Sequence, residues 1–387
     1  MAIQLSYSIG VPSKTRIIWA DVEEVKKELE KFVMADFTDN VSVLVILGDY
    51  GTGKTHSLNY IQYLAQRSLK DIRLKVISFE RPFKNFIEFL EKIEPSLPLE
   101  EIYTIVKSSI NKRKKELTAM LKKSYDEDIL RSIMIFEKAH DSVLKFMYPD
   151  INHDLRTILA KLLTTESKEI FDLAKKWLRG VPLSPTQLRS LGVTGRITTS
   201  NAQDISADYL RIYLSDGGHL LILIDEFEDL GVIGDLKSLV SFRNFLDENL
   251  PRTKIVITMT DEAFEGLRDG KKVFIRKSYP PLRSRLNACK KVRLSNLSIS
   301  KAEKFLVDYV QSLNKNLKNR VTINNDSLQL IFNYTNGSPR LLSALAEYLC
   351  SVSDFNGKID TKIVSMAVEE IKMLSKKIPG GEEIPKI

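Results

Sequence analysis

The chain of 387 residues is 43% hydrophobic, enough for two or three folded domains, and its formal charge of +8 is compatible with an anionic partner such as nucleic acid. Its two cysteines, Cys289 and Cys350, lie far apart and exclude a disulfide framework or a cysteine-rich zinc site. No apolar run approaches the roughly 20 residues that span a bilayer and no signal segment opens the chain, so we expect a cytoplasmic protein without membrane association.

The first elements predicted along the chain are those of an α/β domain. After an irregular lead-in, apolar residues at helical spacing predict a helix over residues 21–32. The apolar, β-branched run at residues 41–47 predicts a buried strand, and the spacing within residues 58–65 predicts a helix after it. Residues 73–79 predict a second strand, which Pro82 ends.

A glycine-rich loop joins the first strand to its helix. Glycine adopts backbone angles that a Cβ forbids, so successive N–H groups of such a loop can surround an anionic phosphate. Lys54 would supply a positive charge to the β- and γ-phosphates, and the Thr55 hydroxyl is placed to bind Mg²⁺. The loop therefore predicts that the chain binds a nucleoside triphosphate with Mg²⁺. The predicted nucleotide-binding residues are Gly48, Asp49, Tyr50, Gly51, Thr52, Gly53, Lys54, Thr55 and His56.

The next strong strand, at residues 220–226, follows much later than a compact domain of this kind requires. Helical periodicity in the intervening residues 83–199 predicts an α-helical insertion. A helix over residues 236–250, a strand over residues 254–260 and a last strand over residues 291–294 continue the alternation that is typical of a parallel sheet covered on both faces. The sequence after residue 300 predicts helices over residues 302–313, 326–334, 339–351 and 363–374.

Two adjacent carboxylates end the strand at residues 220–226. The carboxyl edge of a parallel sheet is where ligands bind, and the phosphate loop is expected at the same edge. Asp225 would bind Mg²⁺ through its water shell, while Glu226 would orient and deprotonate the attacking water. The chain lacks the [NT]-K-x-D segment that specifies guanine, so we expect ATP and its hydrolysis.

Further segments, in this order, resemble the AAA+ ATPases of the initiator type. They are the polar strand end at Thr258 and Thr260, the Pro-Pro-Leu-Arg-Ser-Arg-Leu run at residues 280–286, and the Gly-Ser-Pro-Arg-Leu-Leu run at residues 337–342. Residues 177–180, 191–193 and 221–230 resemble more narrowly the ATP-binding proteins of bacteriophage-exclusion (BREX) systems. The broad likeness covers residues 15–376 apart from the insertion, and the narrower one covers residues 170–300.

The resemblance implies three further roles, two of which have an alternative residue. Thr260 would be the first sensor, a hydroxyl at the γ-phosphate or the attacking water, with Thr258 as the alternative. Arg285 would be the arginine finger that enters a neighbouring subunit's site, with Arg283 as the competing residue. Arg340 would be the second sensor, which brings the terminal domain over the phosphates.

The resemblance also implies the fold class and the domains. The expected α/β fold is an AAA+ type five-stranded parallel sheet with helices on both faces, a large α-helical insert and a C-terminal helical lid. We expect the ATPase core at residues 1–82 and 200–296, the insertion at 83–199, the lid at 297–376 and a flexible tail at 377–387.

The expected function is that of an oligomeric ATPase with nucleotide at the subunit interface. It would drive assembly or remodelling on DNA, or on a DNA-bound protein partner, in genome defence or replication. Lysine clusters such as residues 112–115 would contact phosphates independently of base sequence. The alternative is a signalling switch or scaffold that binds a protein partner with negligible turnover. Glu226 argues against that alternative, because a pure switch has little use for a water-activating carboxylate.

Overall fold

The computed structural model describes residues 23–124, 137–233, 236–269, 279–314, 321–351 and 357–376. The chain divides into two compact units. Unit 1 comprises Met1–Ala35, Ile46–Arg67 and Lys291–Ile387, and unit 2 comprises Asp36–Val45 and Ser68–Lys290. The expected tail, the lead-in and residues 125–136 of the expected insertion lie outside the described residues.

A five-stranded sheet has the order β2-β3-β4-β1-β5. Its strands are β1 (Ser42–Leu47), β2 (Leu74–Phe79), β3 (His219–Ile224), β4 (Thr253–Met259) and β5 (Lys290–Arg293). The strands β2 and β3, and likewise β3 and β4, pair in parallel. The expected α/β class with a five-stranded sheet is confirmed, and each strand lies within a residue or two of its predicted range.

Burial along the strands explains their order in the sheet. Nearly every residue of β1, β3 and β4 is buried, so both faces of these central strands are covered. The strands β2 and β5 each contain exposed residues and lie at the two edges. A continuous apolar run in sequence thus corresponds to a strand with no solvent-facing side.

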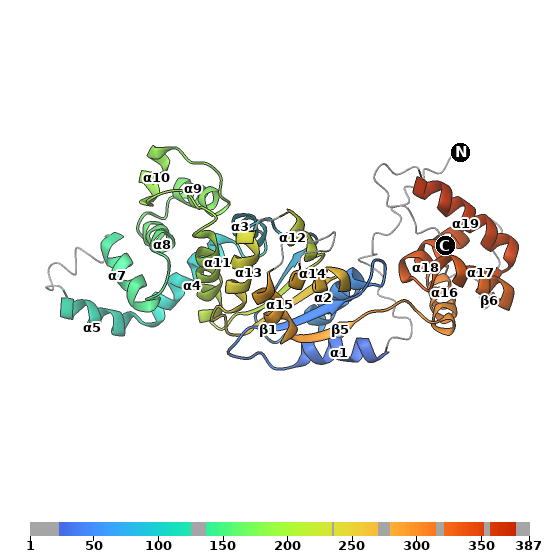
Figure 1. Cartoon of the computed structure of the whole chain (residues 1–387). Helices are drawn as coiled ribbons and strands as arrows, with labels where there is room; N and C mark the ends of the chain where they lie inside the picture. Colours follow the sequence, from blue (N-terminus) through green and yellow to red (C-terminus); the bar gives the residue numbers. More distant parts are fainter. Residues whose placement is uncertain are drawn as a thin grey trace. The chain divides into compact units, whose positions relative to one another are not determined.

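Helices make up the rest of unit 2 (Figure 1). They are α3 (Phe86–Ile93), α4 (Leu99–Lys112), α5 (Lys114–Ser124), α7 (Glu137–Met147), α8 (His153–Thr165), α9 (Lys168–Leu178), α10 (Pro185–Leu191), α11 (Ala202–Ser215), α12 (Glu228–Ile233), α13 (Leu236–Leu246), α14 (Asp261–Asp269) and α15 (Pro280–Asn287). Within the described residues, no strand interrupts the helices between β2 and β3, as an α-helical insertion predicts. None of the described helices is long and apolar enough to cross a membrane.

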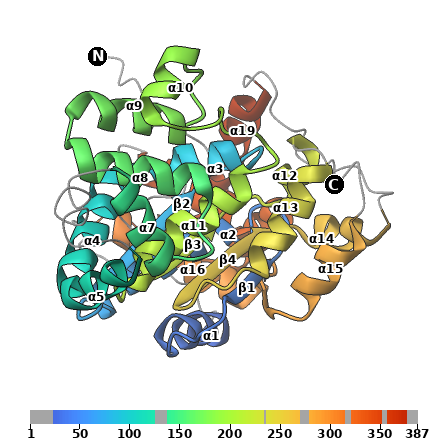
Figure 2. The ribbon, with the colours of Figure 1, turned by 90° about the vertical axis from the view of Figure 1, so that its left-hand side faces the viewer.

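Aromatic side chains connect β2 to the helices beside it. Phe79 at the end of β2 stacks on Phe89 of α3 with ring centroids 5.2 Å apart. Phe89 in turn contacts Phe245 of α13 edge to face, and α11 packs against both α3 and α13 (Figure 2). These rings are almost fully buried, so they form a large part of the core of unit 2.

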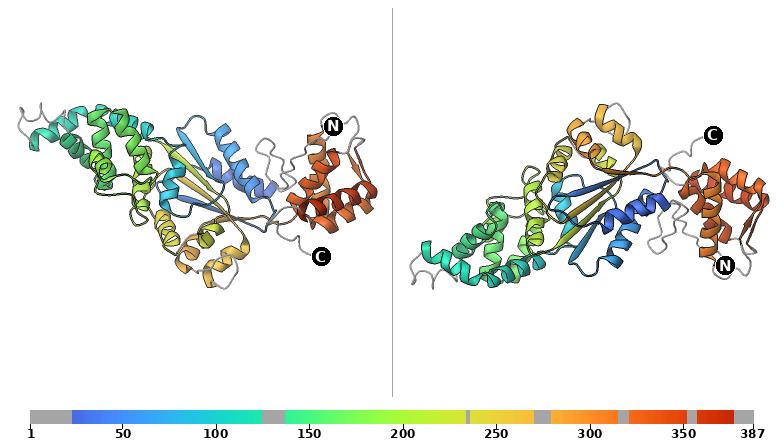
Figure 3. Two further views of the ribbon diagram at one scale, coloured as in Figure 1. Left: turned by 90° about the horizontal axis from the view of Figure 1, so that it is seen from above. Right: turned by 90° about the horizontal axis from the view of Figure 1, so that it is seen from below.

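The described helices of unit 1 are α1 (Glu23–Met34), α2 (Lys54–Ser68), α16 (Ile299–Leu313), α17 (Asn325–Thr335), α18 (Pro339–Ser351) and α19 (Thr361–Lys376). The last four form one group, drawn in orange to red in Figure 3, around a shared apolar core that includes Leu306, Ile331 and Leu345. This group also contains a parallel pair of two-residue strands, β6 (Thr322–Ile323) and β7 (Lys358–Ile359), which the sequence did not predict. Two residues are too few to show a strand period.

Candidate functional site

The glycine-rich loop of unit 1 leads from β1 into α2 with glycine in left-handed conformations. Gly51 has φ +80° and Gly53 has φ +101°, angles that other residues adopt only with strain. Thr52 stabilises the turn between them, because its hydroxyl donates to the carbonyl of Asp49 at 2.8 Å. Gly51 and Gly53 thus have the backbone form that was predicted for the glycines of the loop, whereas Gly48 does not have a positive φ.

Lys54 is the first residue of α2, and its side chain lies against the phosphate loop. Its ammonium donates to the carbonyl oxygens of Gly48 at 2.8 Å and Asp49 at 3.0 Å. Only 8% of the residue is exposed. A buried ammonium beside backbone N–H groups at a helix start is suited to bind an anionic phosphate. Thr55 and His56 follow it in the first turn of the same helix.

Arg340 lies against this loop within unit 1. Its backbone N–H donates to the carbonyl of Gly51 at 3.2 Å, and its guanidinium carbon lies 5.1 Å from the centroid of the Tyr50 ring. Arg340 is the second residue of α18, directly after Ser338 and Pro339. The structure therefore brings the predicted second sensor to the phosphate loop.

Asp225 follows β3 in unit 2 and is 4% exposed. The hydroxyl of Thr258 on β4 donates to its Oδ1 at 2.5 Å. The backbone N–H of Glu226 donates to the same Oδ1 and to the Thr258 hydroxyl oxygen, each at 3.1 Å. These contacts fix the orientation of the Asp225 carboxylate at the carboxyl end of the strand.

Glu226 has a left-handed backbone, with φ +49°. This conformation is uncommon for a residue with a side chain and costs about 1–3 kcal/mol, so it persists only where surrounding contacts hold it. The hydrogen bonds of its N–H to Asp225 and Thr258 are such contacts, and the next N–H, that of Phe227, donates to the Thr258 carbonyl at 2.9 Å. The strand thus turns sharply at the proposed water-activating carboxylate.

The two candidate sensor threonines have different partners. Thr258 contacts Asp225 and Glu226, whereas the Thr260 hydroxyl accepts from the backbone N–H of Ala263 at 3.1 Å. Thr260 therefore caps the start of α14, as threonine commonly does before a helix. The contact between Thr258 and Asp225 was not predicted from sequence.

The two candidate finger arginines also differ. Arg283 stacks on Phe264 at 3.7 Å and donates to Glu265 at 2.8 Å, and its side chain is 15% exposed. Arg285 donates from Nε to Asp247 at 2.9 Å, and its side chain is 35% exposed. Arg283 is packed between α14 and α15. The Arg285 side chain is the more exposed of the two.

Other groups in the structure offer little for metal binding. Within the described ranges, no three His, Cys, Asp or Glu side chains gather where they could hold a metal ion. The Thr55 hydroxyl and the Asp225 carboxylate offer the oxygen ligands that suit Mg²⁺, an ion that keeps several waters and takes phosphate oxygens as ligands. Each of the two side chains, Thr55 in unit 1 and Asp225 in unit 2, thus offers the kind of oxygen that a metal bound with a nucleotide would use.

Several solved structures resemble the chain. The ORC2 protein of Aeropyrum pernix in its ADPNP-ADP complexes is 14% identical over 90% of this chain and 66% of that chain, with a TM-score of 0.47. Cdc6p of Pyrobaculum aerophilum is 13% identical over 96% of this chain and 74% of that chain, with a TM-score of 0.49. The Aeropyrum pernix ORC1 protein in complex with DNA is 12% identical over 95% and 71%, with a TM-score of 0.45.

This chain thus spans about two thirds to three quarters of the length of these proteins. No curated protein matches it. The family model described as BREX system ATP-binding protein BrxC/D matches residues 18–318, which include the phosphate loop, Asp225 and Glu226. The chain therefore belongs to the BrxC/D family of ATP-binding proteins of BREX systems, as the resemblance of residues 221–230 predicted.

Proposed function

We propose that this BrxC/D family member is an oligomeric ATPase that binds ATP with Mg²⁺, hydrolyses it, and couples the nucleotide state to assembly or remodelling on DNA or on a DNA-bound protein. Defence against bacteriophages is the setting that its family favours. The observation that carries the proposal is the oriented Asp225 carboxylate, held by Thr258 with Glu226 directly after it. Such an arrangement is suited to hydrolysis rather than to nucleotide binding alone.

Nucleotide binding would begin at the loop of unit 1. Its backbone N–H groups and Lys54 would hold the β- and γ-phosphates, and Thr55 with Asp225 would hold Mg²⁺. The metal, when bound, would neutralise negative charge on the phosphate oxygens. Arg340 would interact with the γ-phosphate from its place beside Tyr50 and Gly51.

Hydrolysis would depend on Glu226. Its carboxylate would orient the attacking water and accept a proton from it, a contribution that is typically worth about 10²–10⁴ in rate. Asp225 would lie beside the metal in a fixed orientation, since Thr258 holds one of its oxygens in place. Thr260, one residue beyond β4, remains our candidate for the first sensor.

Steady-state phosphate release tests this assignment. Glu226→Gln should lower the rate about 100-fold or more while ATP affinity is kept. Glu262→Gln is the matched control, because Glu262 is an exposed carboxylate at the start of α14 in the same unit. Equal, near-zero rates in the wild type and Glu226→Gln would favour the alternative function. In that case the chain would be a switch or scaffold that binds a protein partner with negligible ATP turnover.

Oligomerisation would complete the site if Arg285 acts in a neighbouring subunit. ATP would then favour assembly by mass action, and hydrolysis would release it. We expect mass measurement to show larger assemblies with ATP, and Arg285→Ala to remove ATP hydrolysis without preventing ATP binding. Arg243→Ala is the control, because Arg243 also pairs with Asp247, at 2.9 Å. A loss of the same size in both variants would assign the effect to Asp247 and not to a finger.

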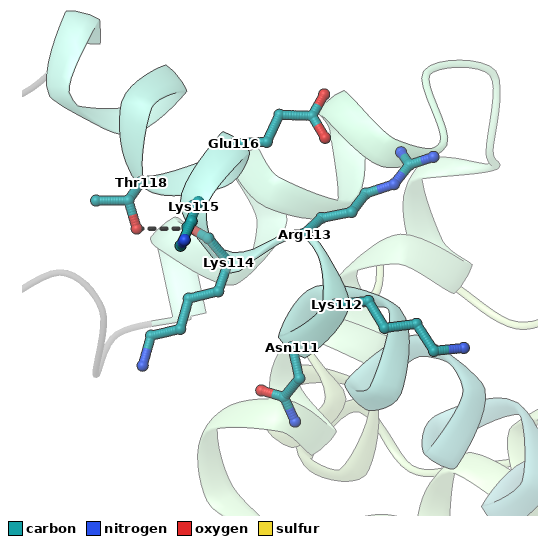
Figure 4. Close-up of a pocket in the computed structure, with 7 residues that line it drawn as sticks. All are labelled: Asn111, Lys112, Arg113, Lys114, Lys115, Glu116 and Thr118. Atoms are coloured by element: carbon teal, nitrogen blue, oxygen red, sulfur yellow. Dashed lines mark hydrogen bonds between the residues drawn. The ribbon is translucent and has the colours of Figure 1, made fainter.

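A cluster of basic side chains in unit 2 favours DNA as the partner. Lys112, Arg113, Lys114 and Lys115 lie exposed where α4 ends and α5 begins, and Figure 4 shows their side chains extending away from the ribbon in several directions. Lys112 pairs with Asp216 at 3.2 Å. Among the described residues, the other three side chains have no acidic partner. Contacts from such residues to phosphates would be sequence-independent and sensitive to salt.

Titration of a labelled duplex at rising salt tests the DNA proposal. We expect affinity to fall steeply with salt. Lys114→Ala/Lys115→Ala should reduce the logarithmic slope by up to about 1.8, since each phosphate that a lysine neutralises contributes about 0.9. Lys168→Ala/Lys176→Ala is the matched control, since it removes two exposed lysines from α9 of the same unit. An affinity that does not change with salt would contradict electrostatic binding of DNA.

A further inference from the structure

Tyr50 is an exposed aromatic residue of the phosphate loop. The residue is 59% exposed, so its ring is not part of a core. The ring faces the guanidinium of Arg340, whose carbon lies 5.1 Å from the ring centroid. Within the described residues, the Arg340 guanidinium makes no hydrogen bond and no ion pair, so the Tyr50 ring is the contact that holds it.

Backbone contacts support this arrangement from the neighbouring residue. The Arg340 N–H donates to the Gly51 carbonyl at 3.2 Å. A Cβ placed on Gly51 would lie 2.8 Å from the Ser338 hydroxyl and 3.2 Å from Cβ of Arg340. The first turn of α18 therefore packs directly on the phosphate loop, at a place where only glycine fits. This packing brings the Tyr50 ring within reach of the guanidinium.

An aromatic ring holds an arginine in a way that leaves its function available. Guanidinium interacts with the face of a ring through charge and stacking, and its N–H donors stay free to bind phosphate. A carboxylate partner would instead occupy those donors and compete with phosphate. Arg283 also stacks on a ring, that of Phe264, but it and Arg285 are each paired with a carboxylate. Among the described residues, the Arg340 guanidinium has no such partner.

We propose that Tyr50 is a positioning residue that holds the Arg340 guanidinium beside the phosphate loop, ready to interact with the γ-phosphate of ATP. This inference rests on the proposed function of Arg340. Tyr50 would favour ATP over ADP, because only ATP presents the γ-phosphate to the positioned cation. Its ring, rather than its hydroxyl, performs this role.

A second tyrosine in unit 1 provides a matched control. Tyr63 is 44% exposed and lies 5.9 Å from the guanidinium carbon of Arg67. The Arg67 guanidinium donates to the Tyr63 hydroxyl at 2.6 Å, and the two residues lie one turn apart on α2. Tyr63→Ala removes a similar exposed ring without touching the loop.

The test is the ratio of the affinities for a non-hydrolysable ATP analogue and for ADP, measured by fluorescence titration. Tyr50→Ala should lower this ratio about two- to fivefold, the range for an exposed cation–π contact. Tyr50→Phe should keep the wild-type ratio, because it keeps the ring. Tyr63→Ala should leave the ratio unchanged. In an Arg340→Ala background, Tyr50→Ala should have no further effect on it.

The outcomes separate this inference from the function on which it rests. A ratio that falls on Arg340→Ala but not on Tyr50→Ala would overturn the role of Tyr50 alone. So would a Tyr50→Phe variant that behaves as Tyr50→Ala, or losses from Tyr50 and Arg340 that simply add. A ratio that is insensitive to Arg340→Ala would overturn both the proposed role of Arg340 and the inference. If Tyr50→Ala lowered the affinity for the ATP analogue and for ADP alike, the residue would instead support the structure of the loop.

Discussion

Units 1 and 2 hold their proposed phosphate-handling groups in different ways. In unit 1, Lys54 donates to backbone carbonyls and Arg340 faces an aromatic ring, contacts that phosphate oxygens can replace or join. In unit 2, the Asp225 carboxylate is buried and is held by a short hydrogen bond from Thr258 of the neighbouring strand. A group that binds an incoming phosphate needs exchangeable contacts, whereas a carboxylate that supports the chemistry needs one fixed orientation.

The packing of α18 on the phosphate loop gives the largest effect that we expect. Gly51→Ala adds a Cβ at φ +80° and 2.8 Å from the Ser338 hydroxyl, whereas Gly53→Ala adds one at φ +101° with nothing within 4 Å. Backbone strain alone costs about 1–2 kcal/mol in each variant. We expect urea unfolding to show a further loss of about 1–3 kcal/mol for Gly51→Ala from overpacking.

Ser338→Ala tests whether overpacking causes this loss, because it removes the hydroxyl that the new Cβ would meet. In the Ser338→Ala background, part of the extra loss from Gly51→Ala should disappear. Equal losses for Gly51→Ala and Gly53→Ala, with no rescue, would contradict a close contact between the loop and α18.

The next largest expected effect concerns the hydrogen bond from Thr258 that orients the Asp225 carboxylate in unit 2. Thr258→Val keeps the shape of the side chain but removes the donor to Asp225, so we expect a loss of about 1.5–3 kcal/mol in the free energy of unfolding. Slower phosphate release should accompany it, because the Asp225 carboxylate is no longer oriented. Thr258→Ser, which keeps the hydroxyl, should recover most of both. Thr260→Val should cost about 1 kcal/mol through loss of the α14 cap.

A comparison of phosphate release in these variants also tests the sensor assignment. If Thr260 contacts the γ-phosphate, Thr260→Val should slow release by more than its loss of stability explains. A Thr258→Val enzyme with wild-type turnover would show that orientation of Asp225 by Thr258 is not needed.

The smallest effect concerns a buried lysine of unit 2. Lys254 in β4 is 2% exposed and faces the Phe37 ring at 4.2 Å, and burial lowers its pKa from 10.5 to about 8 although Asp36 opposes the shift. Between these two pKa values the unfolded chain binds more protons than the folded chain. Stability should therefore rise as the pH increases from about 8 to 10.5, by at most about 1.4 kcal/mol per pH unit.

Urea unfolding of the wild type and Lys254→Met across this pH range isolates the contribution of Lys254. The stability of the wild type minus that of Lys254→Met should rise toward alkaline pH, because Lys254 becomes neutral in the folded wild type at a lower pH than in the unfolded chain. A constant difference from pH 7 to 10 would contradict a lowered pKa for this lysine.

The strands and the loop could be predicted because their signals are local. The apolar run before Gly48 and the one that ends at Asp225 are each continuous, and both strands proved to be buried on both faces. The short helix α10 could also have been predicted. Ser184 accepts from the N–H of Gln187, whose side chain accepts from the Ser184 N–H, so Ser-Pro-x-Gln is a readable capping box.

The contacts within each site could not be predicted, because they depend on register and on packing between distant segments. Thr258 meets Asp225 because the pairing of Ile224 with Ile257 places the next residues of β3 and β4 side by side. From the sequence alone, either Thr258 or Thr260 could be the first sensor, since residues two apart on a strand point to the same face. The contact of Tyr50 with Arg340 joins a loop to a helix almost at the other end of the chain, and no periodic pattern reports such a pair.

We propose above all that Lys54 and Asp225 act on the same Mg²⁺–ATP. Calorimetric titration of ATP, with and without Mg²⁺, tests it most directly when it is repeated on Lys54→Ala, Asp225→Asn and the double variant. We predict that Mg²⁺ strengthens binding to the wild type, that Asp225→Asn removes this gain, and that the double variant loses less than the sum of the single losses. Strictly additive losses, or a gain from Mg²⁺ that survives Asp225→Asn, would show that Lys54 and Asp225 do not act on the same Mg²⁺–ATP.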